Sequence, residues 1–348
     1  MRSHEPTATP SNPSPGKSTP EAPLEALPPE ANGTTSPSAR PRNRRRRTVR
    51  IALAVLTVLV ALLAANAVLV SKQTRQAAGD RIVRLDGGDV HIVESGPPTA
   101  PALVLIHGTA GSTHWWDPVM PMLGVHHVVR IDLLGHGGSA KPASGYSVPE
   151  QARRIGAVLD RLGIGHAAVV GHSLGGMVAT SLADQRRDLV GSLTVIDTGP
   201  RNDAFLADSA AGHLLRVPVI AQLLWQLRDS AIRDGLATAF TRPVKIPDQI
   251  VDDVRGMTYR SYTSTDRASS AYLRERAMPD RLAGLGLPVM VIYGTRDKRW
   301  LPASYESYAG VPRARIERLD GVGHTPMFEE PARTAALIRD FATTGTAH

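Results

Sequence analysis

The sequence predicts an α/β fold in which a mostly parallel eight-stranded sheet is flanked by helices, interrupted by a helical lid and preceded by one transmembrane helix. Three observations predict this fold class. Beyond Arg81, short apolar runs alternate with helical patterns, which is typical of a parallel sheet covered by helices. About ninety residues between two of these runs are helical in pattern, too long for a single crossover connection. An uncharged apolar run of 20 residues precedes the whole arrangement.

The N-terminal tail, residues 1–47, is rich in Pro, Ser, Thr, Ala and Glu and contains no apolar run that could form a core. We expect it to be disordered. Much of the formal net charge of +8 lies at this end, because residues 1–50 hold nine Lys and Arg against four Glu. The rest of the chain is nearly neutral, which argues against nucleic-acid binding. Cysteine is absent, which excludes disulfides, thiolate catalysis and cysteine metal sites.

A transmembrane helix is predicted over residues 48–71. Its apolar stretch, residues 51–70, carries no charge and at about 1.5 Å per residue reaches the roughly 30 Å of a hydrocarbon core. A buried helix of a soluble domain normally keeps a polar stripe, whereas this one has only Thr57 and Asn66 as polar residues. We therefore expect a membrane anchor.

The charges flanking this helix predict its orientation. The twenty residues before the apolar stretch carry seven Lys and Arg, and the twenty after it carry four. The positive-inside rule then puts the N-terminus in the cytoplasm and the domain beyond residue 80 outside it. The alternative is secretion after signal cleavage, for which residues 77–79 offer a weak site. The long region before the apolar stretch argues against cleavage.

Eight apolar runs are candidate strands: residues 82–85, 90–94, 102–106, 127–131, 167–171, 192–196, 288–293 and 315–318. The first two flank Asp-Gly-Gly-Asp at residues 86–89, which predicts a hairpin turn and an antiparallel pair. Later strands alternate with helical patterns such as residues 149–162 and 174–186. The core domain would comprise residues 80–198 and 287–345.

Residues 199–286 form the expected insertion, which we call the inserted segment. Helical patterning occurs in it at residues 214–227, 230–240, 247–255 and 269–277. An insertion of this length after a strand of a parallel sheet is often functional. We expect it to form a helical lid over the sheet.

Ser173 is the candidate nucleophile. It lies in Gly-His-Ser-Leu-Gly at residues 171–175, directly after a predicted strand and at the start of a predicted helix. This strand, turn and helix context is the one that a G-x-S-x-G nucleophile requires. Glycines are needed there because neighbouring backbone approaches too closely for larger side chains.

His324 is the candidate base and Asp297 the candidate carboxylate. A serine hydroxyl needs a base that a carboxylate orients and stabilises. His324 lies in a glycine-rich loop after the last strand, and Asp297 follows the preceding strand, so both should reach the sheet edge that holds Ser173. Asp197 competes with Asp297, and its other interpretation is an aspartate that braces the base of the lid by bonding backbone N–H groups. Asp132 is interpreted as a turn brace.

The oxyanion formed during acyl transfer needs two preorganised N–H donors. The backbone of Leu174, next to the nucleophile, is expected to supply one. The other is expected from Thr109, in the glycine-bearing loop His-Gly-Thr-Ala-Gly-Ser at residues 107–112. Trp115 and Trp116, just after this loop, could line the pocket or anchor a helix.

Five blocks in this order carry a family resemblance: HGTAGSTHWW, RIDLLGHGGSAKP, GHSLGGMVA, VIYGTRD and GVGHTPMFEEP. The chain from about residue 81 to 342 resembles the lid-bearing α/β-hydrolases, which include bacterial esterases, lipase-like enzymes and cofactor-free haloperoxidases. This resemblance implies Ser173, Asp297 and His324 as triad and Thr109 and Leu174 as oxyanion donors, without cofactor or metal. Epoxide hydrolases and haloalkane dehalogenases of the family carry aspartate as nucleophile, so Ser173 argues against both.

These residues predict an enzyme that cleaves carboxylic esters or thioesters through an acyl-enzyme. Its substrate would be a small molecule with a largely apolar acid, because residues 214–225 of the inserted segment are rich in Leu, Val and Ile. One alternative is a cofactor-free haloperoxidase or perhydrolase that uses the same triad. Another is a non-catalytic, membrane-anchored binding protein on the same scaffold.

Overall fold

The computed structural model describes residues 41–206, 221–222, 225 and 229–345. Most of the N-terminal tail predicted to be disordered lies outside the described residues. The same holds for most of the helix predicted at residues 214–227.

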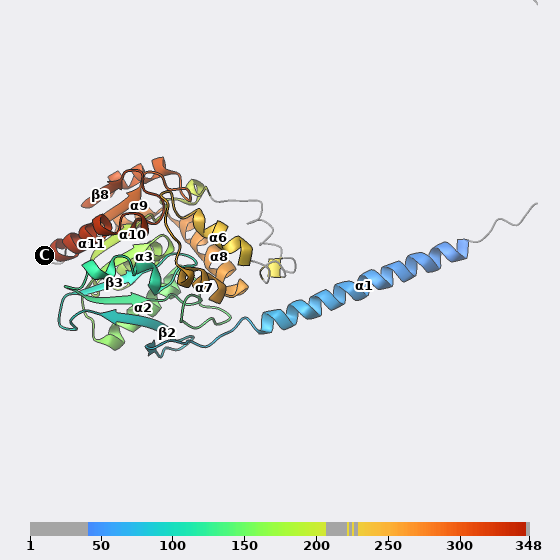
Figure 1. Cartoon of the computed structure of the whole chain (residues 1–348). Helices are drawn as coiled ribbons and strands as arrows, with labels where there is room; N and C mark the ends of the chain where they lie inside the picture. Colours follow the sequence, from blue (N-terminus) through green and yellow to red (C-terminus); the bar gives the residue numbers. More distant parts are fainter. Residues whose placement is uncertain (1–40, 207–220, 223–224, 226–228, 346–348) are drawn as a thin grey trace, which may run out of the picture. The chain divides into compact units, whose positions relative to one another are not determined.

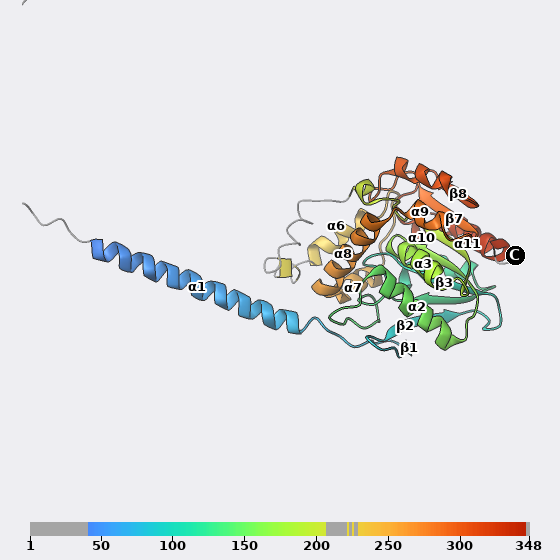
Figure 2. The same ribbon diagram turned by 180° about the vertical axis from the view of Figure 1, so that it is seen from behind.

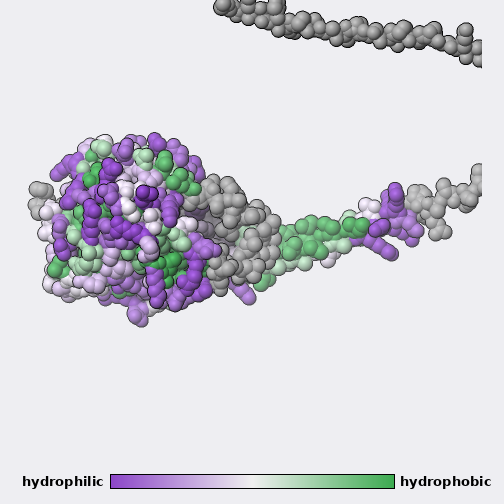
Figure 3. All heavy atoms as spheres, turned by 45° about the horizontal axis from the view of Figure 1, so that its top comes forward, coloured by the Kyte–Doolittle hydropathy of each residue, from purple (hydrophilic) through white to green (hydrophobic). Residues whose placement is uncertain are grey.

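Helix α1 (Pro41–Ser71) begins earlier than predicted. Residues 41–47, predicted to be disordered, form its first turns, because a run of arginines favours helix once the apolar stretch has nucleated it. The part from Asn43 to Ser71 is long and apolar enough to cross a membrane. Its apolar side chains are exposed, and Figure 3 shows them as a continuous green stretch next to the purple basic residues.

The sheet has the eight strands that the sequence predicts: β1 (Ile82–Val83), β2 (Val90–Ser95), β3 (Ala102–Ile106), β4 (His127–Ile131), β5 (Ala167–His172), β6 (Val190–Ile196), β7 (Val289–Gly294) and β8 (Ala314–Leu319). Their spatial order is β1-β2-β4-β3-β5-β6-β7-β8. Strand β2 is antiparallel to both neighbours, and the remaining pairs are parallel. The predicted mostly parallel sheet with an antiparallel first hairpin is confirmed.

Helices cover both faces of this sheet (Figures 1 and 2). Along β3, alternate side chains enter different apolar clusters, as the strand period of two requires. Val104 and Ile106 pack with α2 (Val148–Leu162) and α3 (Leu174–Gln185). Leu103 and Leu105 pack on the other face with the short helices η1 (Thr113–Trp116) and η2 (Met120–Met122) and with α10 (Pro326–Glu329) and α11 (Pro331–Gly345).

The inserted segment lies between β6 and β7. Its described helices are η3 (Asn202–Ala204), α6 (Asp229–Ala237), α7 (Asp248–Gly256), α8 (Tyr259–Glu275) and α9 (Met278–Ala283), and η4 (Pro302–Gly310) follows β7. The prediction that a helix starts at residue 269 is wrong. Helix α8 starts ten residues earlier, at Tyr259, because Thr258 and Ser261 form a capping box, a local signal that hydrophobic periodicity does not reveal.

The middle and the C-terminal part of the inserted segment pack differently. Tyr272 and Leu273, near the end of α8, and Met278 and Leu282 of α9 belong to the core cluster under α2 and α3. Side chains of α6 and α7 form a separate cluster around Trp115. We therefore propose that the part of residues 199–286 able to act as a lid is centred on α6 and α7.

The connection between α1 and β1 is part of the folded body. Gln73 is buried, and its Oε1 accepts the backbone N–H of Arg260 in the first turn of α8 at 2.8 Å. Arg75 and Lys141 form a two-way backbone bridge, with N···O distances of 2.8 and 3.0 Å. The body therefore includes residues before position 80, and experiments on it should use the full chain.

Candidate active site

Ser173 occupies a strained turn between β5 and α3. Its backbone φ is +52° and ψ is −117°, a conformation that side-chain-bearing residues rarely adopt and that often marks a functional site. Gly171 and Gly175 permit the turn, because a Cβ atom on the first would collide with the Gly175 carbonyl and one on the second with the carbonyl of Ile106. The predicted need for glycine on both sides of the serine thus has a direct steric cause.

Asp297 and His324 are joined by a hydrogen bond. Loops after β7 and β8 bring the two side chains together, and His324 Nδ1 lies 2.8 Å from Asp297 Oδ2. The carboxylate also accepts the N–H groups of Arg299 at 2.7 Å and Trp300 at 3.2 Å and the hydroxyl of Tyr305 at 2.9 Å. Burial alone would raise the pKa of Asp297, but the charge and hydrogen bond of His324 lower it. A carboxylate fixed in this way can hold an imidazole in one orientation.

Asp197, the competing carboxylate, has a different environment. Its Oδ1 accepts the N–H of Gly294 at 2.9 Å, which ties the end of β6 to β7. Burial, followed by the charge of Asp297, raises its pKa well above the ordinary value. No hydrogen bond joins it to His324 within the described residues. Asp197 therefore acts as a brace, as the alternative interpretation held, although it braces the sheet and not the lid.

His172 supports the loop that carries His324. Its Nε2 donates to the backbone carbonyl of His324 at 2.8 Å, and the two rings lie 4.9 Å apart. Burial and then the neighbouring charge of His324 lower the pKa of His172 well below its ordinary value. In the sequence, His172 is only one position of the turn motif at residues 171–175. Its role depends on a contact across 152 residues, which no local pattern reveals.

A pocket of about 100 Å³ opens beside the nucleophile. Ser173, His324, Thr109 and Leu174 all line it, so the structure brings together the four residues that the sequence assigned to nucleophile, base and oxyanion donors. A second cavity of about 10 Å³ is lined by Ser173 and His324 together with the loop of Thr109.

One face of α8 forms a wall of the larger pocket. The side chains follow helical spacing, and most are polar: Tyr262, Asp266, Ser269, Ser270 and Leu273. The predicted apolar wall at residues 214–225 is described only at residues 221, 222 and 225, none of which lines the pocket. Trp225 packs instead on Tyr259, with ring centres 6.1 Å apart. The described wall is more polar than the sequence predicted.

The two tryptophans have different positions. Trp116 is fully buried in the core beneath η1 and is an anchor. Trp115 lines the small cavity and stacks on His172 with ring centres 6.0 Å apart. It also packs against α6 and α7. Trp115 therefore serves both purposes that the sequence left open.

Glu329 links the histidine loop to the inserted segment, which sequence reasoning missed. Its carboxylate accepts the N–H of Gly323 at 3.0 Å, and those of Thr241 at 3.1 Å and Arg242 at 2.8 Å. Glu329 belongs to the last of the five motif blocks, which was the available signal. Through these hydrogen bonds Glu329 holds Gly323, the residue before His324, next to Thr241 and Arg242, which follow α6.

Asp197, Asp297 and His324 each place one potential ligand atom within 4.8 Å of the others. The facing Asp297 and His324 atoms already bond each other, and Asp297 Oδ2 also accepts from Tyr305. Because the facing Asp297 and His324 atoms are used within the protein, we assign no metal to this group.

The family of the chain follows from this fold and site. The family model for the alpha/beta hydrolase fold matches residues 101–331, so the chain belongs to the α/β-hydrolase superfamily. An uncharacterized protein of Mycobacterium tuberculosis is 30% identical over 266 residues, 71% of this chain and 76% of that protein. Monoacylglycerol lipase abhd6-B of Xenopus laevis is 26% identical over 261 residues, 70% and 76% of the two chains. The crystal structure of an enol-lactonase from Burkholderia xenovorans is 23% identical with a TM-score of 0.62, covering 76% of this chain and all of the lactonase.

Proposed function

We propose that the protein is a serine hydrolase that cleaves carboxylic esters or thioesters with Ser173 as nucleophile. The observation that carries this proposal is the 2.8 Å hydrogen bond between His324 Nδ1 and Asp297 in a pocket shared with Ser173. With its Nδ1–H directed at the carboxylate, His324 keeps its Nε2 lone pair for the serine proton.

The reaction proceeds in two acyl transfers. Ser173 Oγ attacks the carbonyl carbon while His324 takes its proton, and the N–H groups of Thr109 and Leu174 bind the oxyanion. The alcohol or thiol leaves with the proton from His324, which gives the acyl-enzyme. Water then attacks the acyl group by the same route and releases the acid. Asp297 stabilises the imidazolium in both halves.

The pocket lining supports a substrate with both apolar and polar parts. Leu174, Met177 and Leu273 offer an apolar surface to an acyl chain, in keeping with the largely apolar acid expected from the sequence. Ser269 and Arg299 line the same pocket and favour a polar or anionic substituent on the substrate. The relatives named as lipase and lactonase also act on carboxylic esters, which agrees with this reaction class.

An ester panel tests the proposal. We expect the full-length protein in detergent to hydrolyse short p-nitrophenyl esters, and Ser173→Ala to lose about 10³-fold or more in kcat. A fluorophosphonate probe should label wild type and not the variant. Retained hydrolysis in Ser173→Ala would contradict the assignment, and absence of both hydrolysis and labelling in wild type would favour a binding protein. Peroxide-dependent bromination of monochlorodimedone far above hydrolysis would favour the haloperoxidase.

We also propose that α1 is an uncleaved anchor with its N-terminus in the cytoplasm and the hydrolase domain outside. The excess of arginine before the apolar stretch supports this orientation. Protease added to intact cells should then digest the domain, whereas protection until the cells are permeabilised would reverse the topology. A mature N-terminus near residue 80 would instead indicate a cleaved signal.

A further inference from the structure

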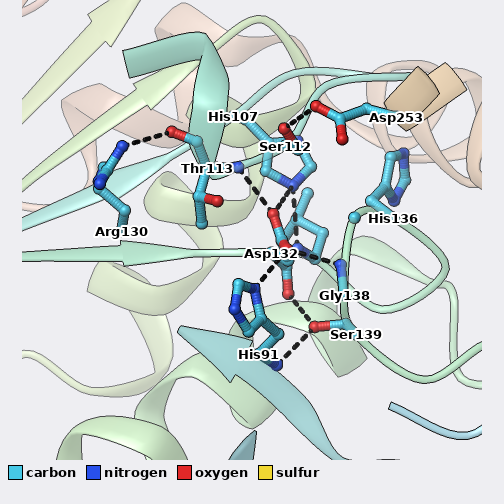
Figure 4. A network of polar contacts seen from close by, with 12 residues as sticks. His91, His107, Ser112, Thr113, Arg130, Asp132, His136, Gly138, Ser139 and Asp253 are labelled. Carbon is cyan, nitrogen blue, oxygen red and sulfur yellow. Dashed lines mark hydrogen bonds and ion pairs between the residues drawn. The ribbon is translucent and has the colours of Figure 1, made fainter. Parts of the chain in front are cut away.

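Asp253 of α7 reaches across to the chain that follows the oxyanion loop. Its Oδ2 accepts the hydroxyl of Ser112 (Figure 4). The same oxygen lies 3.1 Å from His114 Nδ1, and Oδ1 accepts the amide of Gln249 at 3.0 Å. The Ser112 side chain is fully buried, and the Asp253 side chain is only 7% exposed. The contact joins residues 141 positions apart, one in the core and one in the inserted segment.

A second carboxylate holds the same stretch from the core side. Asp132, just after β4, accepts the N–H of Thr113 at 2.7 Å through Oδ1. Its Oδ2 lies 2.8 Å from both His91 Nδ1 and the N–H of Gly138. Burial would raise the pKa of Asp132, but these bonds and the charge of His107 lower it to about 2. Asp132 is therefore an anion at neutral pH, and residues 112 and 113 are held between it and Asp253 (Figure 4).

The loop before this stretch carries the proposed oxyanion donor. At its start, His107 Nε2 accepts the N–H of Leu133 at 3.0 Å, which fixes the loop to the core. Gly111 closes a turn by donating to the Gly108 carbonyl at 3.1 Å, with Thr109 and Ala110 between them. The far end of the loop is fixed at Ser112, where Asp253 binds. The position of the Thr109 N–H thus depends on one core contact and one contact to α7.

Apolar packing also holds η1 and α7 together. Trp115 of η1 forms a cluster with Ile250, Val251 and Val254 of α7, and Ala110 of the loop packs against this cluster. Such packing alone would hold α7 in place, so a buried carboxylate is not needed for attachment. Burying it costs free energy unless its hydrogen bonds are made, and those to Ser112 and His114 are made only when α7 lies on η1.

We propose that Asp253 is a positioning residue for the oxyanion loop, so that the Thr109 N–H is set for acyl transfer only when α7 is seated on η1. This inference rests on the proposed serine-hydrolase function. It makes the inserted segment part of the transition-state machinery, because its seating controls the site that receives the oxyanion.

The test compares Asp253→Asn with Asp252→Asn in the full-length protein in detergent. Asp252 is the matched control, since it is the neighbouring acid on α7 but its side chain is exposed and paired with Arg255. For Asp253→Asn we expect kcat to fall about tenfold or more with KM changed less than about twofold, since only transition-state binding is lost. Asp252→Asn should behave like wild type.

Inhibitors provide a readout specific to the oxyanion. A trifluoromethyl ketone adds to Ser173 and places an oxyanion in the hole, whereas the matching secondary alcohol binds without forming one. In Asp253→Asn, the inhibition constant of the ketone should rise in proportion to the loss in kcat/KM, and that of the alcohol should stay within about twofold. An equal weakening of both inhibitors, or no change in either, would overturn the inference.

A second variant covers the case in which Asp253→Asn does not fold. Ser112→Ala removes the loop side of the same contact and should show the same selective loss of ketone binding. If both variants fold, the double variant should lose less than the sum of the single losses, because the residues share one contact. Additive losses would contradict the proposal. Failure of the proposed function is distinguishable, because wild type itself would then neither hydrolyse esters nor bind the ketone.

Discussion

His172 and His324 are joined by a 2.8 Å hydrogen bond in which a side chain of the nucleophile turn holds the backbone of the base loop. Because the bond is made to the backbone carbonyl, it fixes the position of the main chain from which the His324 side chain extends. We expect His172→Phe, which keeps the stacking with Trp115, to lower kcat about tenfold, the equivalent of one buried hydrogen bond. Steady-state kinetics on a p-nitrophenyl ester would check this. The exposed His166→Phe serves as control, and equal activity of His172→Phe and wild type would remove the proposed support.

The two carboxylates beside His324 should respond differently to amide substitution. Asp297→Asn should lower kcat about 10³- to 10⁴-fold, because the amide cannot stabilise the imidazolium. Asp197→Asn should cost less than about fivefold, because the raised pKa of Asp197 favours the neutral acid, which the amide resembles, and the acceptor for Gly294 remains. Comparing kcat of the two variants identifies the carboxylate of the triad. A larger loss of kcat in Asp197→Asn than in Asp297→Asn would assign this role to Asp197.

Arg299 should determine a preference for anionic substrates. Its guanidinium lines the pocket beside Ser173 and donates to the Gly235 carbonyl at 3.2 Å, and no carboxylate pairs with it within the described residues. In Arg299→Gln, the ratio of kcat/KM for the p-nitrophenyl monoester of adipic acid to that for p-nitrophenyl hexanoate should fall about tenfold.

The control for this preference is Arg296→Gln, which removes the same charge from an exposed side chain nearby. It should leave the ratio of the two esters as in wild type. If Arg299→Gln and Arg296→Gln change the ratio equally, the effect is general electrostatics and Arg299 has no specific role.

His114 should make the seating of α7 depend on pH. The hydrogen bond to Asp253 is the largest influence on its pKa and raises it, burial lowers it, and the charges of Asp253, Asp117 and Asp132 add to the increase. A histidine whose pKa is higher in the folded than in the unfolded state stabilises the fold while it is protonated. This stabilisation is fully present below the unfolded-state pKa of about 6.5, and it is lost as pH rises through the folded-state pKa.

The corresponding measurement is urea unfolding of the full chain in detergent. His114→Asn should lower the free energy of unfolding more at about pH 5.5 than at about pH 8.5, because the stabilisation by protonated His114 decreases as pH rises through its raised pKa. A larger effect at the higher pH would contradict the assigned direction. The exposed His166→Asn serves as the control variant.

Much of the fold was predictable because its determinants are local. Strands such as β3 and β5 are uninterrupted apolar runs, and the strand, glycine turn and helix around Ser173 can be read within about ten residues. Helix α8 was misplaced because its first half lacks an apolar period and starts at the Thr258 capping box. The pairing of His324 with Asp297 was predictable because the carboxyl ends of parallel strands lie at the same edge of the sheet.

The sequence by itself determined the fold class, the apolar helix α1 and the residues assigned to nucleophile, base and acid, because each depends on local pattern or on strand order. Only the tertiary structure decided how these residues are supported: His172 against the His324 backbone, Tyr305 on Asp297, Glu329 beneath Gly323 and Asp253 on Ser112. These contacts depend on the packing of side chains distant in sequence, where a shift of one helical turn would break the bond without changing any local pattern.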